Sequence, residues 1–410
     1  MTQLKREGGK GEATEIKNVF THVILRFSGE IGIKGDPTRQ LWEKKVLGHV
    51  TSRLKGTKVS WTMGRGFLKV TSLPSFDDIM TTLPRCFGLS SFSPAIATPL
   101  TIEHMKKKAE QLVRHYLKKE PGIEHFGVVV DTNLSEIDSM VIKNEVGAFI
   151  DQKFDLGVYL DEPDLPVHFD VRRNEGYLYS ERFLGAGGLP SRVQGKVITL
   201  LSGGPDSTLA MLLAAKRGCE IVPVFFDFGR EDLRKKAREQ AQEVAARIFT
   251  RWLPYQGKMY VVPFTKVVNK IVECGRLTFA HIHLRRFMFK TAELIAEKEG
   301  AKGIVTGEVI GEKSSQTLHN LSVTSRVVRG SCLLRPLAGR DKEEIFAELA
   351  ELDGKLRELT HTSIEPCNII TSTPPSTKAD LDQVRDLERR INVTVHDLRN
   401  ILEESTIVSF

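Results

Sequence analysis

The sequence has few cysteines, no closely spaced cysteine pair and no long apolar run. None of its five cysteines belongs to a CxxC pair, and they are widely spaced: Cys86, Cys219, Cys274, Cys332 and Cys367. An odd number at irregular spacing argues against a disulfide framework or a zinc site and favours a reducing compartment. No apolar stretch reaches the roughly 20 residues of a membrane helix, and residues 1–17 have no apolar core for a signal peptide. We therefore expect a cytoplasmic protein that does not enter a membrane.

The chain is too long for one compact core, and it carries an excess of positive charge. With 410 residues, two or three domains are expected. An apolar content of 40% and a charged content of 27% are those of a globular protein. The formal charge of +7 is compatible with a polyanionic partner, although a basic surface without any partner accounts for it equally well.

The strongest motif is Leu-Leu-Ser-Gly-Gly-Pro-Asp-Ser at residues 200–207. It follows an expected strand at 197–201 and precedes an expected helix at 208–217. Two glycines let the backbone approach an anion closely, and a helix N-terminus favours phosphate. The Gly-Lys-Ser/Thr ending of a Walker A loop is missing. The motif resembles the PP-loop of ATP pyrophosphatases, Ser-Gly-Gly-x-Asp-Ser, which cleave ATP between the α and β phosphates. We call residues 202–207 the PP-loop; the alternative is an ordinary glycine-rich turn.

From residue 192 onward, apolar strands alternate with helical segments, which predicts a doubly wound parallel sheet. Ligands bind such sheets at the carboxyl ends of the strands. Helices are expected at 208–217, 231–248, 285–299 and 341–352, and strands at 197–201, 220–226, 259–263, 303–306 and 332–335.

A polar loop follows the fourth of these strands. In that loop Gly307 allows close backbone approach, and Gln316 has the amide groups to contact an adenine or a ribose. A generic connecting loop is the alternative interpretation.

The first half of the chain has a different pattern. Residues 20–95 show the βαββαβ order of a ferredoxin-like fold, including a short strand at 58–62. Residues 96–191 form a second α+β unit with a lysine-rich helix at 102–118. Residues 1–19 are polar and are expected to be a disordered tail. The fold class is therefore multidomain, with α+β units before an α/β domain.

Three further features are candidates for function. Arg285 and Arg286 are expected at the start of a helix, where the dipole disfavours cations. They bind a phosphate there or form a solvated pair, and both interpretations stay open. Cys367 lies in a loop bracketed by prolines, so its thiol is expected to be accessible and reactive, whereas a buried, inert thiol is the default for the other cysteines. His281 and His283 would share one face of a strand, but no third ligand is evident, which argues against a metal site.

The series of motifs resembles the tRNA 4-thiouridine synthetase (tRNA sulfurtransferase) family. The likeness runs from about residue 20 to residue 385. The motifs that carry it occur in this order: Arg26–Gly35, Gly185–Pro190, the PP-loop, Arg285-Arg286, Thr306–Glu308, Ser314–Leu318, Leu334–Leu337 and Asp341–Ile345.

The resemblance implies three domains: ferredoxin-like (20–95), THUMP (96–191) and PP-loop (192–410). The first two would bind the acceptor end of tRNA. It also implies ATP contacts at Leu200, Leu201, Phe225, Phe226, Arg285, Gly307 and Gln316, with Ser202, Gly203, Gly204, Asp206 and Ser207 around the pyrophosphate. Cys367 matches the family's functional cysteine.

The implied reaction adenylates the C4 oxygen of uridine, position 8 by resemblance, and sulfur then replaces it to give 4-thiouridine. Mg²⁺ would neutralise the phosphates, with Asp206 as the candidate to hold it or to orient the loop. Cys367 would accept sulfur or resolve a persulfide. No rhodanese-like domain follows residue 410, so we expect a separate sulfur donor: a cysteine desulfurase, a persulfide carrier or sulfide. Without CxxC we expect no iron–sulfur cluster. A homodimer and a role in supplying sulfur for thiamine are left open.

Two alternatives remain at this stage. One is a PP-loop ATP pyrophosphatase that modifies another nucleoside or a small molecule, which would not need the two N-terminal units. The other is a tRNA-binding module whose active site has decayed, which would not need an intact PP-loop with Asp206.

Overall fold

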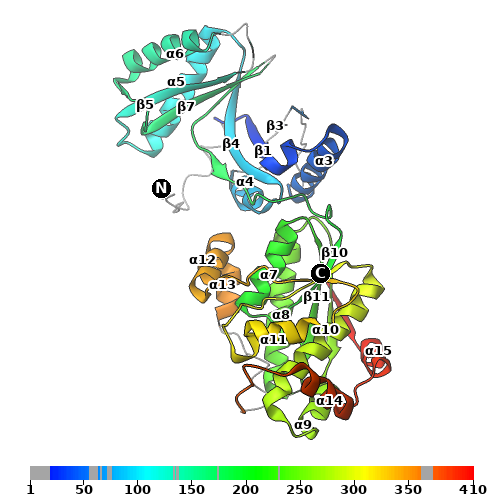
Figure 1. Cartoon of the computed structure of the whole chain (residues 1–410). Coiled ribbons are helices and arrows are strands. Elements are labelled where there is room, and N and C mark those ends of the chain that lie inside the picture. The colour runs from blue at the N-terminus through cyan, green and yellow to red at the C-terminus, as the bar shows by residue number, and fades with distance from the viewer. Residues whose placement is uncertain are drawn as a thin grey trace. The chain divides into compact units, whose positions relative to one another are not determined.

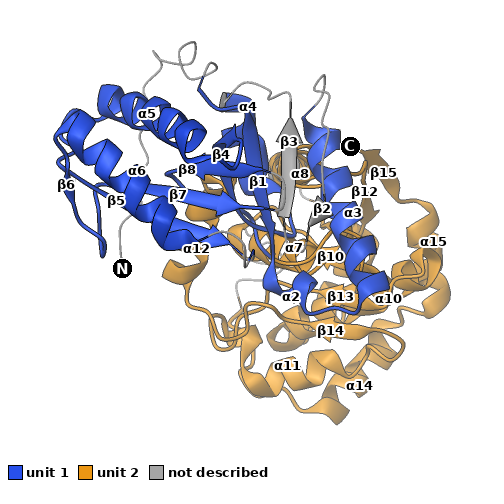
Figure 2. Cartoon of the chain, turned by 90° about the horizontal axis from the view of Figure 1, so that it is seen from above, with its two compact units in different colours: residues 1–187 blue, residues 188–410 orange. Residues whose placement is uncertain are grey.

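The computed structural model describes residues 19–54, 63–64, 67–71, 76–132, 134, 138–172, 175–229, 231–361 and 373–410. The chain divides into two compact units, residues 1–187 (unit 1) and 188–410 (unit 2), shown in blue and orange in Figure 2. The expected disordered tail, apart from residue 19, and the strand expected at 58–62 lie outside the described residues. In the described part, no helix is long and apolar enough to cross a membrane.

Unit 1 is built on one mixed sheet. Its strand order, among the described residues, is β2-β3-β1-β4-β8-β7-β5-β6, with β9 also paired to β4. The strands are β1 (His22–Phe27), β2 (Met63–Gly64), β3 (Phe67–Thr71), β4 (Leu89–Thr98), β5 (His125–Thr132), β6 (Gly157–Val158), β7 (Leu165–Val171), β8 (Gly176–Tyr179) and β9 (Phe183–Leu184). The helices are α2 (Gly29–Gly32), α3 (Asp36–Arg53), α4 (Phe76–Thr82), α5 (Ile102–Lys119) and α6 (Ser139–Phe154), with a 3₁₀ turn η1 (Leu83–Arg85).

Strand β4 joins the two halves of this sheet (Figure 1). It pairs antiparallel with β1, where Ala95 lies opposite His22, and with β8, where Ile96 lies opposite Leu178. The order β2-β3-β1-β4 is that of a ferredoxin-like sheet. The boundary expected between residues 95 and 96 therefore falls inside one strand, and the division into domains 20–95 and 96–191 stays a prediction.

The lysine-rich helix expected in the second half of unit 1 is α5. It begins at the N-cap Thr101, whose side chain accepts a hydrogen bond from the amide of His104. Its apolar residues recur every three or four positions and pack on the sheet, because this spacing places them on one helix face. Part of its positive charge is neutralised: Nζ of Lys106 lies 2.6 Å from Glu145 of α6. Lys107 and Lys118 are exposed.

Unit 2 has the expected parallel sheet, with strand order β14-β13-β10-β11-β12-β15 among the described residues. The strands are β10 (Lys196–Leu200), β11 (Glu220–Asp227), β12 (Lys258–Pro263), β13 (Gly303–Val305), β14 (Cys332–Leu334) and β15 (Thr406–Ser409). The first five confirm the sequence-based strands within a residue or two. The sixth, β15, was not predicted and pairs antiparallel with β12 at the edge.

Helices of unit 2 cover the sheet. They are α7 (Pro205–Lys216), α8 (Glu231–Arg251), α9 (Thr265–Glu273), α10 (Ala280–Glu299), α11 (Leu318–Ser325), α12 (Lys342–Leu352), α13 (Gly354–His361), α14 (Leu381–Ile391) and α15 (Val395–Glu403), with 3₁₀ turns η2 (Leu277–Phe279) and η3 (Ser314–Gln316). Every residue of β11 after the first is buried, as a strand covered on both faces requires. The core joins apolar residues of β10–β13 to Leu284, Phe287 and Ile295 of α10.

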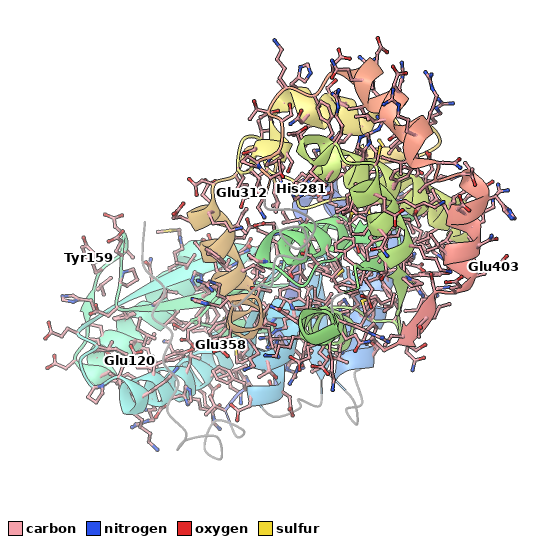
Figure 3. The ribbon with its side chains drawn as sticks, turned by 90° about the horizontal axis from the view of Figure 1, so that it is seen from below. Glu120, Tyr159, His281, Glu312, Glu358 and Glu403 are labelled. Atoms are coloured by element: carbon pink, nitrogen blue, oxygen red, sulfur yellow. The ribbon has the colours of Figure 1, made fainter. Side chains whose placement is uncertain are left out.

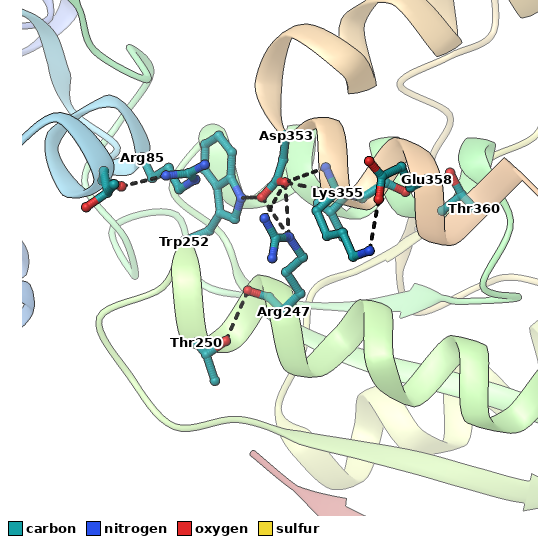
Figure 4. Close-up of polar contacts among 10 residues, drawn as sticks. Arg85, Arg247, Thr250, Trp252, Asp353, Lys355, Glu358 and Thr360 are labelled. Atoms are coloured by element: carbon teal, nitrogen blue, oxygen red, sulfur yellow. Dashed lines mark hydrogen bonds and ion pairs between the residues drawn. The ribbon is translucent and has the colours of Figure 1, made fainter. Parts of the chain in front are cut away.

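A buried ion pair fastens α13 to α8 (Figure 4). Asp353, only 1% exposed, accepts hydrogen bonds from Arg247 with one distance of 2.6 Å, and from the indole of Trp252. Its carboxylate also accepts from the amides of Lys355 and Leu356 at the start of α13. One side chain therefore caps a helix and anchors it to its neighbour.

Candidate functional site

The PP-loop connects β10 to α7 through a left-handed turn at Gly203. Its φ of 85° is a conformation that residues with a Cβ rarely adopt. A Cβ at Gly203 would also lie 3.1 Å from the amide nitrogen of Ala241 in α8. The glycine is therefore required by the turn and by the packing of the loop on α8.

The two serines of the PP-loop hold it in shape. The amide of Ser202 donates to Oγ of Ser207 at 3.1 Å, and the two hydroxyl oxygens are 3.0 Å apart. The amide of Gly204 donates to Oγ of Ser202 at 3.3 Å. Helix α7 begins at Pro205, three residues earlier than predicted, with Gly204 as its N-cap. The first amides of a helix have no carbonyl partner within it, so this turn is suited to an anion.

One cleft brings together almost all of the predicted ligand-binding residues. It lies at the carboxyl ends of β10, β11 and β13, where the topology predicts it. Its lining includes Leu200, Leu201, Ser202, Gly204, Asp206, Ser207, Phe225, Phe226, Arg285, Gly307 and Gln316. Gly203 supports the loop from behind, and Cys367 lies outside the described residues.

Apolar and charged side chains share the lining of this cleft. Pro205 of the PP-loop also lines the cleft, together with residues that were not predicted from the sequence to bind a ligand: Val224, Phe228, Met288, Thr306, Glu308, Lys313 and Lys342. Among these additional residues, the apolar side chains come from β11, from the position directly after it and from α10, whereas the charged side chains come from the loop after β13 and from α12. A ligand with a flat apolar part and an anionic part fits this composition.

Gly307 is needed for a contact within the protein. A Cβ at this position would lie 2.6 Å from the carbonyl carbon of Asp206 and from the amide nitrogen of Ser207. The close approach that the sequence predicts for Gly307 is therefore to the first turn of α7. The loop after β13 and the PP-loop are packed directly on each other.

The structure corrects the interpretation of the two arginines. Helix α10 begins at Ala280, so Arg285 and Arg286 lie in its second turn, where the argument from the helix dipole no longer applies. Neither is part of a solvated pair on a first turn. Arg286 is 4% exposed, and its Nε lies 2.6 Å from Glu388. Only Arg285 lines the cleft.

A buried carboxylate, Glu308, fixes Arg285. It is 1% exposed and lies 2.7 Å from Nη1 of Arg285 and 2.8 Å from Nε of Arg335. Arg335 donates in turn to the hydroxyl of Ser325. Sequence reasoning noted the motifs that contain Glu308 and Arg335, but gave neither a role. Glu308 could have been found from the sequence, because it closely follows the short buried strand β13. Arg335 follows β14, whose residues are exposed or half-buried, so no such signal marks it.

The carboxylate of Asp206 forms an ion pair with the side chain of Lys342. Nζ of Lys342 lies 2.7 Å from Oδ1 and 2.9 Å from Oδ2 of Asp206, and 3.0 Å from Oε1 of Glu312. Burial raises the pKa of the Asp206 carboxyl, while the hydrogen bond from Lys342 opposes the shift. Lys342 is the first residue of α12, whose capping box between Asp341 and Glu344 fixes that turn.

Gln316 is oriented by the backbone. Its Oε1 accepts a hydrogen bond from the amide of Val309 at 3.2 Å, and the residue is 4% exposed. Since the oxygen is already engaged, the amide nitrogen is the group available as a donor to a ligand.

The remaining candidates give mixed results. Cys86 is buried, and burial raises the pKa of its thiol to about 12. Cys332 is exposed on β14, so the expectation of a buried thiol is wrong there. His281 and His283 lie on α10, not on a strand, and burial lowers the pKa of His283 to about 4. Across the described ranges, no group of three or more His, Cys, Asp or Glu side chains is placed to hold a metal ion.

Comparison with known proteins adds three family matches along the chain. A model described as "ThiI ferredoxin-like domain" matches residues 22–93, and a "THUMP domain" model matches 100–181. A model described as "Thiamine biosynthesis protein (ThiI)" matches residues 192–393.

Curated relatives share nearly the whole length. A protein of Brevibacillus brevis named "Probable tRNA sulfurtransferase" is 33% identical, over 94% of this chain and 96% of its own. A protein of the same name from Sulfurisphaera tokodaii is 29% identical, over 94% and 99%.

Solved structures agree with this. The chain is similar to one titled "Crystal structure of a 4-thiouridine synthetase - RNA complex with bound ATP", with a TM-score of 0.81 and 29% identity over 95% of this chain and 100% of that one. A structure from Pyrococcus horikoshii, with a TM-score of 0.62 and 24% identity over 81% of this chain and 99% of that one, shares the fold.

Proposed function

The chain belongs to the tRNA sulfurtransferase family, and on this premise we propose that it uses ATP to convert a tRNA uridine into 4-thiouridine. The observation that carries the proposal is the single cleft at the carboxyl ends of β10, β11 and β13. It combines a helix N-terminus suited to phosphates with apolar walls suited to a nucleobase. Except for Gly203, the residues that the resemblance implies for ATP binding line this cleft.

ATP would lie along this cleft with its phosphates at the start of α7. The amides of the first turn of α7 and the side chain of Arg285 would contact the phosphates, because both are donors to anions. Phe225, Phe226 and Met288 offer apolar surface to the adenine. The amide nitrogen of Gln316 would donate to the base or the ribose.

The chemistry follows from the poor leaving ability of the C4 oxygen of uridine. This oxygen attacks the α-phosphate, pyrophosphate leaves, and the N3 proton is lost. Hydrosulfide then attacks C4 directly, and AMP leaves with the former carbonyl oxygen. If a persulfide attacks through its terminal sulfur instead, AMP leaves in the same way and the base stays joined to the carrier by a disulfide. A second thiol must then attack the carrier sulfur, forming a new disulfide with it and releasing 4-thiouridine. Catalysis of both steps depends mainly on positioning and on cations near the phosphates.

We propose Mg²⁺ as the counterion of the phosphates, where it would neutralise their charge. Carboxylate oxygens are suitable ligands for this ion, and the Asp206 carboxylate in the cleft already holds the ammonium of Lys342. Asp206 would hold the ion, and Lys342 would then be free to contact a phosphate.

The remaining roles rest on the resemblance. Unit 1 would bind the acceptor end of tRNA, with the exposed Lys107 and Lys118 of α5 among its phosphate contacts. Modification at position 8, a homodimer, a cytoplasmic location, and a separate cysteine desulfurase, persulfide carrier or sulfide as sulfur source all stay predictions. So does transfer of sulfur through Cys367.

The test is to incubate the protein with a tRNA transcript, ATP, Mg²⁺ and sulfide, and to measure 4-thiouridine by mass spectrometry of the nucleosides. We expect product with the natural transcript and none with a transcript that has cytidine at position 8. Consumption of ATP without a thiolated base would favour a pyrophosphatase with another substrate. Unchanged ATP consumption in Asp206→Ala would favour the decayed binding module.

The role of Cys367 needs a separate measurement. Cys367→Ser should lose activity with a protein persulfide donor. Full activity of this variant with that donor would remove the thiol from the mechanism.

A further inference from the structure

Glu312 is a carboxylate beside the cleft that the proposed mechanism leaves without a role. It lies in the loop that leads from β13 to η3 and is labelled in Figure 3. Its side chain is 21% exposed, and its Oε1 lies 3.0 Å from Nζ of Lys342. Through this contact it is linked to a residue that lines the cleft.

The ammonium of Lys342 uses all three of its protons. Two hydrogen bonds go to the two oxygens of Asp206 and the third goes to Glu312. The three side chains come from separate parts of unit 2: the first turn of α7, the loop after β13 and the first turn of α12. Two carboxylates surround one ammonium, so the group has one excess negative charge.

This arrangement is expected to change when ATP and Mg²⁺ bind as proposed. Both oxygens of Asp206 accept hydrogen bonds from the ammonium of Lys342, and a metal ion held by the same carboxylate would repel that ammonium. The entering phosphates attract that ammonium. Without a second partner, the Lys342 side chain released from Asp206 would be free to adopt many conformations, because its four-carbon stem is flexible.

We propose that Glu312 is a positioning residue that keeps the ammonium of Lys342 at the cleft while its hydrogen bonds pass from Asp206 to the phosphates. The proposal rests on the proposed function. Glu312 holds the ammonium from outside the PP-loop, so its contact survives when Asp206 changes partner. Lys342 then reaches the phosphates from a fixed position.

The alternative is a partly exposed ion pair without a role in the reaction. Such pairs contribute little to stability. The two interpretations differ in what the removal of Glu312 does to kinetics. Glu312→Gln removes a negative charge near an anionic substrate, so the KM for ATP should not rise. Loss of the tether should lower kcat by about tenfold.

The first experiment measures the tether directly and does not depend on activity. Lysines of the nucleotide-free protein are acetylated with acetic anhydride, and labelling of Lys342 is followed by mass spectrometry against Lys355 as an internal reference. Asp206→Asn imitates the release of Lys342 by Asp206. We expect Lys342 to stay protected in this variant and to become several-fold more reactive only in the double variant with Glu312→Gln. Equal reactivity in the single and double variants would overturn the proposal.

The second experiment measures kcat and KM for ATP in the thiolation reaction. Glu312→Gln should lower kcat with no rise in KM, and Glu312→Asp should restore part of the kcat. Glu343→Gln is the matched control, because it removes an exposed carboxylate adjacent to Lys342 in α12. A wild-type kcat in Glu312→Gln, or a loss equalled by the control, would overturn the proposal. If the wild-type protein itself makes no 4-thiouridine, the proposed function fails, while the labelling result still decides whether the tether exists.

Discussion

Replacing Gly307 with alanine should impair catalysis by displacing the PP-loop. A Cβ at Gly307 lies 2.6 Å from the carbonyl carbon of Asp206 and from the amide nitrogen of Ser207. Ordinary van der Waals contact begins near 3.4 Å, so one of the two segments must move by about 0.8 Å. Both contacts are with backbone atoms, which cannot rotate away as the end of a side chain can. The displacement therefore reaches the first turn of α7.

The size of the effect follows from this displacement. A misplacement of about 1 Å at an active site can lower a rate by about 100-fold. For G307A we expect kcat/KM to fall by between about tenfold and about 100-fold, a loss of about 1.4 to 2.7 kcal/mol in transition-state stabilisation. The crowding should also lower the free energy of unfolding by about 1–3 kcal/mol.

The assay is the rate of 4-thiouridine formation, quantified by mass spectrometry at several ATP concentrations. Gly339→Ala is the matched control, because a Cβ at Gly339 meets no atom within 4 Å. The control should keep the wild-type kcat/KM. If G307A also keeps it, the close contact between the two loops is unnecessary for catalysis and the reasoning is refuted.

Three further predictions concern stability. Glu308→Gln leaves two arginines without their shared carboxylate, and urea unfolding should show a loss of about 3–5 kcal/mol; an unchanged midpoint would contradict this. Asp353→Asn weakens the pair with Arg247, so amides of α13 should exchange hydrogen faster while those of α15 do not. Burial raises the pKa of Glu299, but hydrogen bonds from Lys258, Tyr260 and Lys196 outweigh it and hold the pKa at about 2. The stability that Glu299 contributes is therefore present above its unfolded pKa of about 4.3 and lost as pH falls towards 2, a slope that Glu299→Gln should reduce.

Much of the fold of unit 2 could be predicted, because the sequence patterns that indicate its strands and helices are local. Apolar strands alternating with helices define a parallel sheet, and the topology places the loops after β10, β11 and β13 at one edge. Leu200, Phe225 and Gln316 were placed in one cleft by resemblance, and the structure does bring them together. Their contacts with ATP stay predictions.

The missed features depend on long-range contacts or on weak local signals. Lys342 meets Asp206 across 136 positions of the chain, a contact that no periodicity encodes. Helix α10 begins at Ala280 after a 3₁₀ turn, and its N-cap Phe279 makes no side-chain capping bond, so no capping residue marks the start. Strand β15 has only four residues and gains its order from pairing with β12.

Strand β4 has a consequence for how unit 1 folds. Its ten residues extend for about 34 Å and carry hydrogen bonds to partners in both halves of the sheet. Cutting the chain between residues 95 and 96 would leave each fragment with only part of β4. The backbone amides and carbonyls at the new sheet edges would then be unpaired, which promotes aggregation. The ferredoxin-like and THUMP models match separate stretches of sequence, but the two halves share strand β4, so we expect unit 1 to unfold as one cooperative unit.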